Sequence, residues 1–437
     1  MPDAWDLPER DDTEKALSEW WTIFDDAVLT DLIEDVRQRN LDIVAATARL
    51  DSYAAGYGIA RSELTPTLGA FGGATRDRET ERVRNPVGGP LPDNPAWIYR
   101  SGVFMSWELD VWGKSRGKIA AARGDWDASI EDRRDLLVML QAQAASEYIR
   151  LRTAQARLAY ARSNVDLQSE TLRIVKDRFE AGLTGELDVH QASMNLEATK
   201  SQIPQLQTQI QQSINSLCLL TGRLPGELGY LMETAEIPFA VDLPRALPAD
   251  LIRNRPDIRA AERRLAAQTA RIGVARADFL PLLELDGSFA LAATDTGELL
   301  ESEAVKYSIG PSFSWPIFTG GARRGQLRAA ESRAEAARAK YEQEVLAAYR
   351  ESADATANFL NEVERLGHLD KTVESAEKSV EVVSSLYVSG LVDFQNVLDT
   401  QRQLASYQDQ RASSRGGSSI GLVAIYRALG GGWVAND

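Results

Sequence analysis

The chain has 437 residues, 44% of them hydrophobic and 26% charged, and 64 acidic residues against 49 Lys and Arg give a net charge of -15. This hydrophobic content argues against a disordered chain, and the lack of a basic patch argues against a nucleic-acid partner. The single cysteine, Cys218, excludes an intramolecular disulfide framework. The sequence contains no run of about 18 apolar residues, so no transmembrane helix is predicted.

The first part of the chain is predicted to place a helix before two strands. We expect residues 1–26 to be an extended N-terminal segment and a helix to run from about 27 to 63. Pro66 follows this helix and would end it. Strands are expected at about 66–76 and 97–107, with a loop rich in Pro, Gly and charge between them.

A long helix and a returning helix are predicted next. Residues 114 to 181 contain no proline and are rich in good helix formers. About 67 helical residues span on the order of 100 Å. Apolar positions recur there at spacings of three and four, which indicates a narrow coiled-coil stripe. Gly182 suits the position after a helix C-terminus, so the returning helix would run from this turn to Gly222.

The second half of the chain repeats the first. Asn40-Leu41-Asp42-Ile43 and Arg255-Pro256-Asp257-Ile258 lie 215 residues apart, and from Trp107 and Trp315 onward the offset is 208. Such self-similarity predicts a duplicated architecture. The expected parts are therefore repeat 1 at residues 27–222, a connector at 223–246, repeat 2 at 247–430 and a tail at 431–437. Within repeat 2 we expect a helix, strands at about 281–292 and 306–316, a long helix and a return helix.

The strand patterns alternate between bulky and small side chains. In "YSIGPSFSW", the residues of one parity are bulky: Tyr307, Ile309, Pro311, Phe313 and Trp315. In water such a face would need a covering layer, and the apolar stripes of the long helices are expected to pack on each other instead. Alternating strands of about ten residues with aromatic residues near their ends are typical of a transmembrane β-barrel.

Four strands cannot close a barrel, and hydrocarbon tolerates a sheet only when it is closed. Two chains would give eight strands and a filled interior, whereas three would give twelve strands and a lumen. Small inward residues suit a lumen, which favours three chains. The long helices would then form a second, α-helical barrel that continues the pore.

Several segments resemble the TolC family, the outer-membrane channels of tripartite efflux and secretion systems. They include "SWELDVWGKSRG", "FEAGLTGELDV", "RPDIRAAERRLAAQTARIGVARADFLP", "WPIFTGG" and "ALGGGW". The likeness runs from about Trp20 to Trp433 and is to the lipoprotein branch that serves resistance-nodulation-division pumps. It implies an α+β membrane protein: a homotrimer with a 12-stranded transmembrane β-barrel, four strands per chain, continuous with a long periplasmic α-helical barrel.

The resemblance also implies a function and partners. The chain would be the passive exit duct of a tripartite efflux pump in the outer membrane of a Gram-negative bacterium, with a gated periplasmic tip. Its partners would be a periplasmic adaptor protein, an inner-membrane resistance-nodulation-division transporter and outer-membrane lipid, with no cofactor. That branch has a lipid-modified (palmitoylated) mature N-terminal cysteine, whereas this chain starts at Met1. We expect a lipid-anchored native form, with signal peptide and anchor removed from this chain.

By the same resemblance, the periplasmic gate would include Asp399, Asn396 and Asp188. Asp399 and Asn396 are three residues apart and so share a helical face, and the alternative is that Asp399 pairs with Arg402 on a solvated face. The adaptor would dock on the two tips, whose residues are Gly182, Leu183, Thr184, Gly390, Leu391 and Val392.

Four residues are expected on the inner face of the barrel: Glu284, Asp286, Ser308 and Ser312. With a charge of 3 × -15 = -45 per trimer, an acidic lumen would favour cations.

Two other classes of function are an enzyme and a soluble scaffold. An enzyme would need a catalytic or metal-binding constellation, and the two histidines, His190 and His368, belong to none. We therefore expect no catalytic residues and no metal ligands. A soluble coiled-coil scaffold with a small strand cap is the alternative function, and it would be soluble without detergent.

Overall fold

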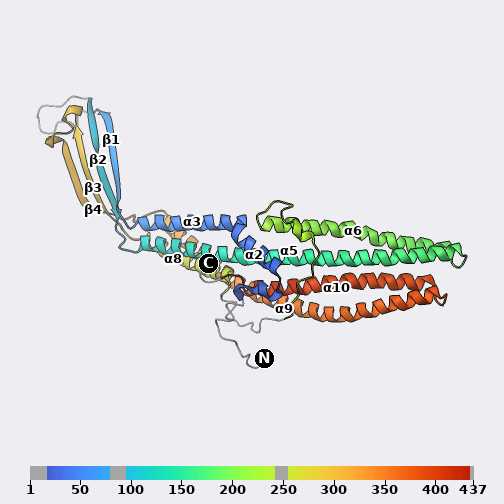
Figure 1. Cartoon of the computed structure of the whole chain (residues 1–437). Helices are drawn as coiled ribbons and strands as arrows, with labels where there is room; N and C mark the ends of the chain where they lie inside the picture. The colour runs from blue at the N-terminus through green and yellow to red at the C-terminus, as the bar shows by residue number, and fades with distance from the viewer. Residues whose placement is uncertain (1–16, 79–94, 242–253, 434–437) are drawn as a thin grey trace, which may run out of the picture. The chain divides into compact units, whose positions relative to one another are not determined.

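The computed structural model describes residues 17–78, 95–241 and 254–433. It divides into two compact units, each built from both repeats (Figure 1). The helical unit comprises residues 1–48, 130–259 and 342–437, and the sheet unit comprises residues 49–129 and 260–341. Residues 1–16, 79–94, 242–253 and 434–437 lie outside the described part. They include parts of the expected N-terminal segment, of the loop between the first two strands, of the connector and of the tail.

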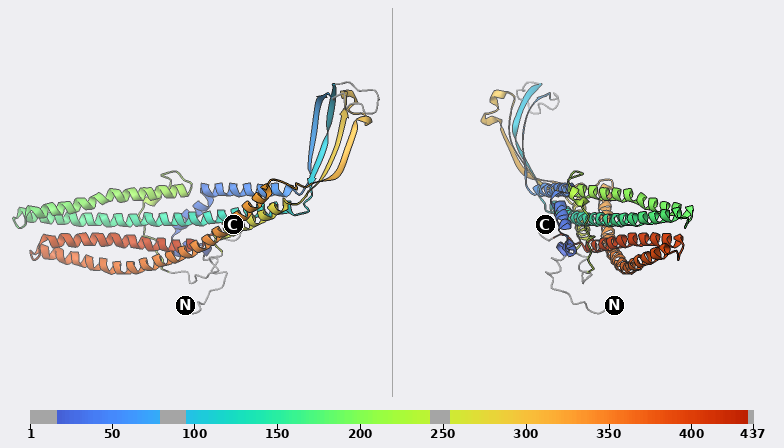
Figure 2. Two further views of the ribbon diagram at one scale, coloured as in Figure 1. Left: turned by 180° about the vertical axis from the view of Figure 1, so that it is seen from behind. Right: turned by 45° about the vertical axis from the view of Figure 1, so that its right-hand side comes forward.

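The sheet unit contains one antiparallel sheet of four strands in the order β1-β2-β3-β4. The strands are β1 (Thr67–Asp77), β2 (Ala96–Glu108), β3 (Leu282–Ala293) and β4 (Val305–Ser314), and two short 3-10 helices, η3 (Thr296–Glu298) and η4 (Ser302–Ala304), lie between β3 and β4. All four strands begin and end within two residues of the predicted positions. Figure 2 shows that the strands curve along their length and that none of the described helices of this unit covers either face.

The register divides the side chains between two faces, because successive residues of a strand point to opposite sides. The apolar face carries the bulky residues of β2, β3 and β4, which are Trp97, Tyr99, Val103, Met105, Trp107, Leu283, Leu285, Phe289, Leu291, Tyr307, Ile309, Pro311 and Phe313. The polar face carries Arg100, Ser106, Glu108, Glu284, Asp286, Ser288, Lys306, Ser308 and Ser312. The four-stranded sheet predicted for each chain is therefore present, and one of its faces is apolar.

Four long helices follow the strands. α5 (Lys114–Glu180) and α9 (Ala322–Val388) have 67 residues each, and α6 (Glu186–Leu220) and α10 (Phe394–Ala428) have 35 each. Figure 1 shows that, in the helical unit, α6 runs back along α5 and α10 runs back along α9. Within the described ranges, no helix combines the length and apolar character needed to cross a bilayer.

The helix expected from 27 to 63 is divided in two at Asn40. α2 (Ala27–Arg39) and α3 (Leu41–Ser62) are separated because Asn40 has extended backbone angles, φ -63° and ψ 127°. Its side-chain oxygen accepts the amide of Asp42 at 2.8 Å, as an N-cap does, and its Nδ2 donates to the Leu220 carbonyl at 2.8 Å. This tertiary hydrogen bond holds the break.

The second repeat makes the same contact with a different residue. Its helix, α8 (Pro256–Ala277), starts at a proline, which favours the first helical position. Arg255, which is equivalent to Asn40, donates from Nη1 to the Ala428 carbonyl at 2.8 Å, and Ala428 is equivalent to Leu220. The duplication thus extends to individual hydrogen bonds.

The joints between helix and strand are duplicated as well. Trp107 Nε1 donates to the Leu64 carbonyl at 3.0 Å, and Trp315 Nε1 donates to the Phe279 carbonyl at 3.0 Å. Trp107 lies at the end of β2, and Trp315 directly follows β4. Each tryptophan bonds to the segment that precedes the first strand of its hairpin. Both ends of each hairpin are therefore fixed at its base.

The hydrophobic core of the helical unit includes residues of the N-terminal segment, which the sequence predicts to be extended. Trp20 to Phe24 form a 3-10 helix, η1 (Trp20–Phe24), rather than an extended segment. Trp20 is fully buried and stacks on Tyr426 with ring centroids 5.6 Å apart. Because burial of Trp and Phe removes a large apolar area from water, this segment packs instead of remaining extended.

The connector is tied to α5 by polar side chains. It contains the 3-10 helix η2 (Gly229–Met232), whose Leu231 is fully buried. Gln155 donates to the Leu231 carbonyl at 2.8 Å, and Arg152 donates to the Glu233 carbonyl at 2.6 Å. These bonds satisfy backbone carbonyls that the connector, lacking a sheet partner, would otherwise leave unpaired.

Candidate functional site

The two interhelical turns at the ends of α5 and α9 have the same backbone structure. The amide of Gly182 donates to the Phe179 carbonyl at 2.9 Å, and that of Leu183 to the Arg178 carbonyl at 2.9 Å. Gly390 and Leu391 make the equivalent bonds to Tyr387 and Leu386. Because φ is 71° at Gly182 and 73° at Gly390, each turn requires the left-handed conformation that glycine adopts without strain.

The side chains of these turns differ in exposure. Leu183 is 65% exposed and Leu391 is 71% exposed, so each turn presents one leucine to solvent. Thr184 donates to the carboxylate of Asp188 on the first turn of α6. Val392 packs against a small core that includes Tyr387 and Phe394.

The gate candidates on α10 share one exposed face. Asn396 and Asp399 are exposed, while Val397 and Leu398 between them are buried. Asp399 accepts a hydrogen bond from Gln395 at 3.0 Å. Asp188 lies on α6, in the other hairpin, and its bond to Thr184 stays within its own turn.

Arg402 does not pair with Asp399, which is the alternative that the sequence offers for this carboxylate. Its Nε donates to Asn195 Oδ1 on α6 at 3.1 Å. Within the described part of the chain, the carboxylate of Asp399 is therefore left to Gln395 and solvent.

Polar contacts hold α10 against α5 along its length, and sequence reasoning missed them. Gln401 donates to Thr171 at 2.8 Å, and Asn164 donates to Gln408 at 2.9 Å. Further along, Asp409 accepts two bonds from Arg157, at 2.6 and 3.2 Å. Near the tip, α5 contacts α9 instead: Arg178 donates to the Val388 carbonyl at 2.9 Å and lies 4.9 Å from the Tyr387 ring centroid. No local pattern in the sequence pairs these residues, which are up to 252 positions apart.

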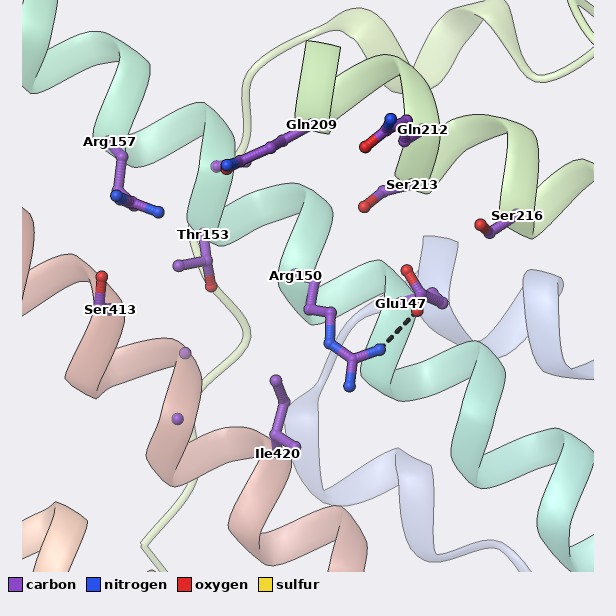
Figure 3. Close-up of a pocket in the computed structure, with 13 residues that line it drawn as sticks. Glu147, Arg150, Thr153, Arg157, Gln209, Gln212, Ser213, Ser216, Ser413 and Ile420 are labelled. Atoms are coloured by element: carbon purple, nitrogen blue, oxygen red, sulfur yellow. Dashed lines mark hydrogen bonds and ion pairs between the residues drawn. The ribbon is translucent and has the colours of Figure 1, made fainter. Parts of the chain in front are cut away.

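A polar groove of about 470 Å³ opens between α5, α6 and α10 (Figure 3). Its walls carry Glu147, Arg150, Gln209, Gln212, Ser213 and Ser413. Small residues of α10 line it at Gly416 and Gly417. At this groove the two helical hairpins face each other through polar and small side chains, beside the buried apolar cluster that both hairpins share.

The four predicted lumen residues gather on the polar face of the sheet. Glu284 and Ser312 are directly opposite in the register, and Ser312 donates to Asp286 at 3.0 Å. Ser308 lies 3.0 Å from Ser288 between their hydroxyl oxygens. β3 and β4 thus place two carboxylates and a hydroxyl ladder on the face opposite the bulky residues.

This face also contains an aromatic pair that the pattern did not predict. The rings of Phe71 and Phe104 lie 6.5 Å apart, on the same side of the sheet as Ser106. The Phe104 ring occupies the space that a side chain at Gly69 would need, with ring atoms 2.4 Å from a Cβ placed there. The absence of a side chain at Gly69 leaves room for this ring.

A partly buried acidic residue, Asp135, lies in the helical unit near Arg255. Burial, followed by the neighbouring Asp257 carboxylate, raises the pKa of Asp135 to about 6, although the Arg255 guanidinium opposes this rise. Arg255 itself bonds to Asp257 at 2.7 Å and to Glu351 at 2.9 Å. Within the described residues, no group of three or more His, Cys, Asp or Glu side chains is arranged to hold a metal ion.

Comparison with known proteins assigns the chain to a family. The model of the family described as outer membrane efflux protein matches residues 32–223 and 247–431. The chain is 33% identical to the probable efflux pump outer membrane protein SepC of Pseudomonas putida over 96% of this chain and 87% of SepC. It is 32% identical to the solvent efflux pump outer membrane protein SrpC of Pseudomonas putida, over 94% and 86% of the two chains.

A solved structure agrees with this assignment. The outer-membrane channel OprN superposes with a TM-score of 0.90 and 34% identity, covering 99% of this chain and 98% of OprN. The resemblance recognised in the sequence is thus confirmed, and a soluble coiled-coil scaffold is not supported. The chain belongs to the outer membrane efflux protein family, and it is a transport channel of the Gram-negative outer membrane rather than an enzyme.

Proposed function

We propose that three copies of the chain form a passive exit duct with a 12-stranded transmembrane barrel. The observation that carries this proposal is the four-stranded sheet itself, in which β1 and β4 each have one edge that no other described strand pairs with. Hydrocarbon cannot satisfy the amides and carbonyls of such edges, so β4 of one copy must pair with β1 of the next. This contact is head-to-tail and generates a closed ring.

The polar face of the sheet supports three copies rather than two. An eight-stranded barrel is filled by its inward side chains, whereas Arg100, Glu284, Asp286 and Lys306 require water. Twelve strands enclose a lumen in which these groups remain hydrated. The apolar face then contacts lipid, and the long helices continue the pore as a periplasmic α-helical barrel.

The gate is proposed at the α10 face that carries Asn396 and Asp399, with Asp188 at the neighbouring hairpin. Three copies around a threefold axis would bring these polar side chains together and narrow the aperture. The exposure of Asp399 and the engagement of Arg402 with Asn195 support this role, because the carboxylate is not neutralised within its own chain.

The duct is proposed to work with two partners. SepC and SrpC are named as components of efflux pumps, so we infer that this chain also serves a pump. A periplasmic adaptor would contact the two tips, where Leu183 and Leu391 are exposed. A resistance-nodulation-division transporter in the inner membrane would supply the energy for transport.

The protein mass of the purified particle tests this proposal. Light scattering in mild detergent should give the mass of three chains, with aggregation once detergent is withdrawn. In planar bilayers the same preparation should conduct cations preferentially. The Glu284→Gln/Asp286→Asn variant should lose part of that preference, because β3 has lost both of its lumen-facing carboxylates. A monodisperse monomer that is stable in plain buffer would contradict the shared barrel.

A further inference from the structure

Two phenylalanine rings lie on the polar face of the sheet. Phe104 is opposite Gly69 and Ser288 in the register, and Phe71 is opposite Gly102. The rings are 6.5 Å apart and inclined by 42°. Phe71 is 40% exposed and Phe104 is 45% exposed. Strands β1 and β2 therefore present a pair of apolar rings to the side that is the lumen under the proposed function.

A purely structural role accounts for only one of the two rings. The Phe104 ring covers Gly69, and an aromatic side chain over a cross-strand glycine stabilises an edge strand. A Cβ placed at Gly102, opposite Phe71, would first meet the backbone of β3, and one placed at Gly73 would meet nothing within 4 Å. Phe71 thus fills no comparable gap. An exposed apolar surface rimmed by polar groups is characteristic of a binding site.

The charged side chains of this face are sorted along the strands. Three carboxylates lie at the end of the sheet that joins the helices, and two cations lie toward the hairpin loops, beyond which β1 ends in a carboxylate. In that order they are Glu108, Glu284 and Asp286, then Arg100 and Lys306, and finally Asp77. The pair of rings lies between the three carboxylates and the two cations.

Asp286 is the acidic neighbour of the rings. A residue on the diagonal across two strands lies about 7–8 Å away, and Asp286 stands in this relation to Phe104. Its carboxylate accepts a hydrogen bond from Ser312 at 3.0 Å, which orients it. On the other side of the pair, Arg100 stands in the same relation to Phe71.

This order of charges favours a cationic solute. A solute that comes from the helices meets the three carboxylates before the rings, and an acidic surface concentrates cations. The faces of phenyl rings also attract cations. Pairing of β1 with β4 of the next copy uses the edge of the strand and leaves both rings on the open face.

We propose that Phe71, Phe104 and Asp286 form a binding site for aromatic cations in transit, on the wall of the barrel. The aromatic body of the solute stacks on the two rings, and its positive charge points toward Asp286. Arg100 repels that charge from the other side and so fixes the orientation. The inference rests on the proposed function, because it needs the polar face to line a water-filled lumen, and it gives each trimer three such sites.

Saturation-transfer NMR with the full-chain trimer in lipid nanodiscs tests this site, with empty nanodiscs as the blank. The probe is benzyltrimethylammonium, and tetramethylammonium and benzyl alcohol supply its charge and its ring separately. The Phe71→Leu/Phe104→Leu variant keeps apolar bulk over Gly69 but lacks both rings, so it should bind the probe about tenfold more weakly. Phe289→Leu removes an exposed ring from the apolar face. It is the matched control and should bind the probe as the wild type does.

The charge of the site is tested separately from its rings. Asp286→Asn should weaken binding of benzyltrimethylammonium by about threefold, because a carboxylate near the cation is lost. The same variant should bind benzyl alcohol as the wild type does. Arg100→Gln should not weaken binding of the cation.

Three results would overturn the proposal. Equal affinity of the wild type and the double leucine variant would leave the rings with a packing role alone. Equal affinity of the wild type and Asp286→Asn for the cation would remove the charge recognition. Tighter binding of benzenesulfonate than of benzyltrimethylammonium, lost in Arg100→Gln, would identify an anion site instead. Light scattering of each sample separates the two levels, because a trimer that does not bind the probe contradicts this site alone, whereas a monomer contradicts the proposed function.

Discussion

At the residue scale, Asp399 is the part of the proposed gate that can be changed most cleanly. Its carboxylate is exposed and bonded to Gln395 alone among the described side chains. Asp399→Ala should raise single-channel conductance by about twofold, because three fewer charges and smaller side chains loosen a closed ring. Asp370→Ala removes an exposed carboxylate from α9 and serves as the charge-matched control. Identical conductance of the wild type and Asp399→Ala would place the constriction elsewhere.

Asp135 predicts how the stability of the helical unit depends on pH. Its pKa is raised from 3.8 to about 6, so the folded state binds a proton more tightly than the unfolded state. Stability should therefore fall as pH rises from about 4 to 6, and the loss should be complete above pH 6. Asp135→Asn should be neutral at pH 4 and stabilising at pH 8, by at most about 3 kcal/mol.

Thermal unfolding followed by circular dichroism at these two pH values checks this expectation. Asp166→Asn, at an exposed position of the same helix, should leave the pH dependence unchanged. A melting temperature for Asp135→Asn that differs from wild type equally at pH 4 and pH 8 would show that the carboxyl does not titrate in this range.

At the element scale, the two turns test whether the tips are docking surfaces. Leu183→Asp and Leu391→Asp should each weaken binding of the periplasmic adaptor by at least about tenfold, since burying a leucine is worth about 1.5–3 kcal/mol. The double variant should bind more weakly than either single variant. Surface plasmon resonance with the immobilised trimer measures these affinities. Leu219→Asp, at an exposed leucine near the other end of α6, is the control, and equal weakening by this variant would contradict tip docking.

The same scale shows what the sequence could predict. Strand positions, the long helices and the glycine turns follow from local rules, because alternation, helix propensity and a positive φ at Gly182 each act within a few residues. The break at Asn40 was missed because its cause is a hydrogen bond to Leu220, 180 positions away. Phe104 was missed for a similar reason, since its ring depends on the space above Gly69 in the neighbouring strand.

At the scale of the whole molecule, both repeats contribute to both compact units. Sequence similarity finds the duplication, and equivalent bonds such as those of Trp107 and Trp315 show that the copies also fold alike. The polar contacts between hairpins could not be predicted, because pairs such as Arg157 and Asp409 are set by tertiary packing. The copies differ at the junction between the returning strand and the long helix, where repeat 1 has Asp110 and repeat 2 has Phe318.

The register of the sheet also determines the order in which it can fold. Paired residues are 19 to 39 positions apart between β1 and β2 and 14 to 32 apart between β3 and β4, but 176 to 194 apart between β2 and β3. Closing such a long loop carries an entropic cost that the local hairpins avoid. Each hairpin should therefore form early and join its partner late. During that interval a hairpin can pair with the matching hairpin of another nascent chain, so ring closure competes with exchange of repeats between copies.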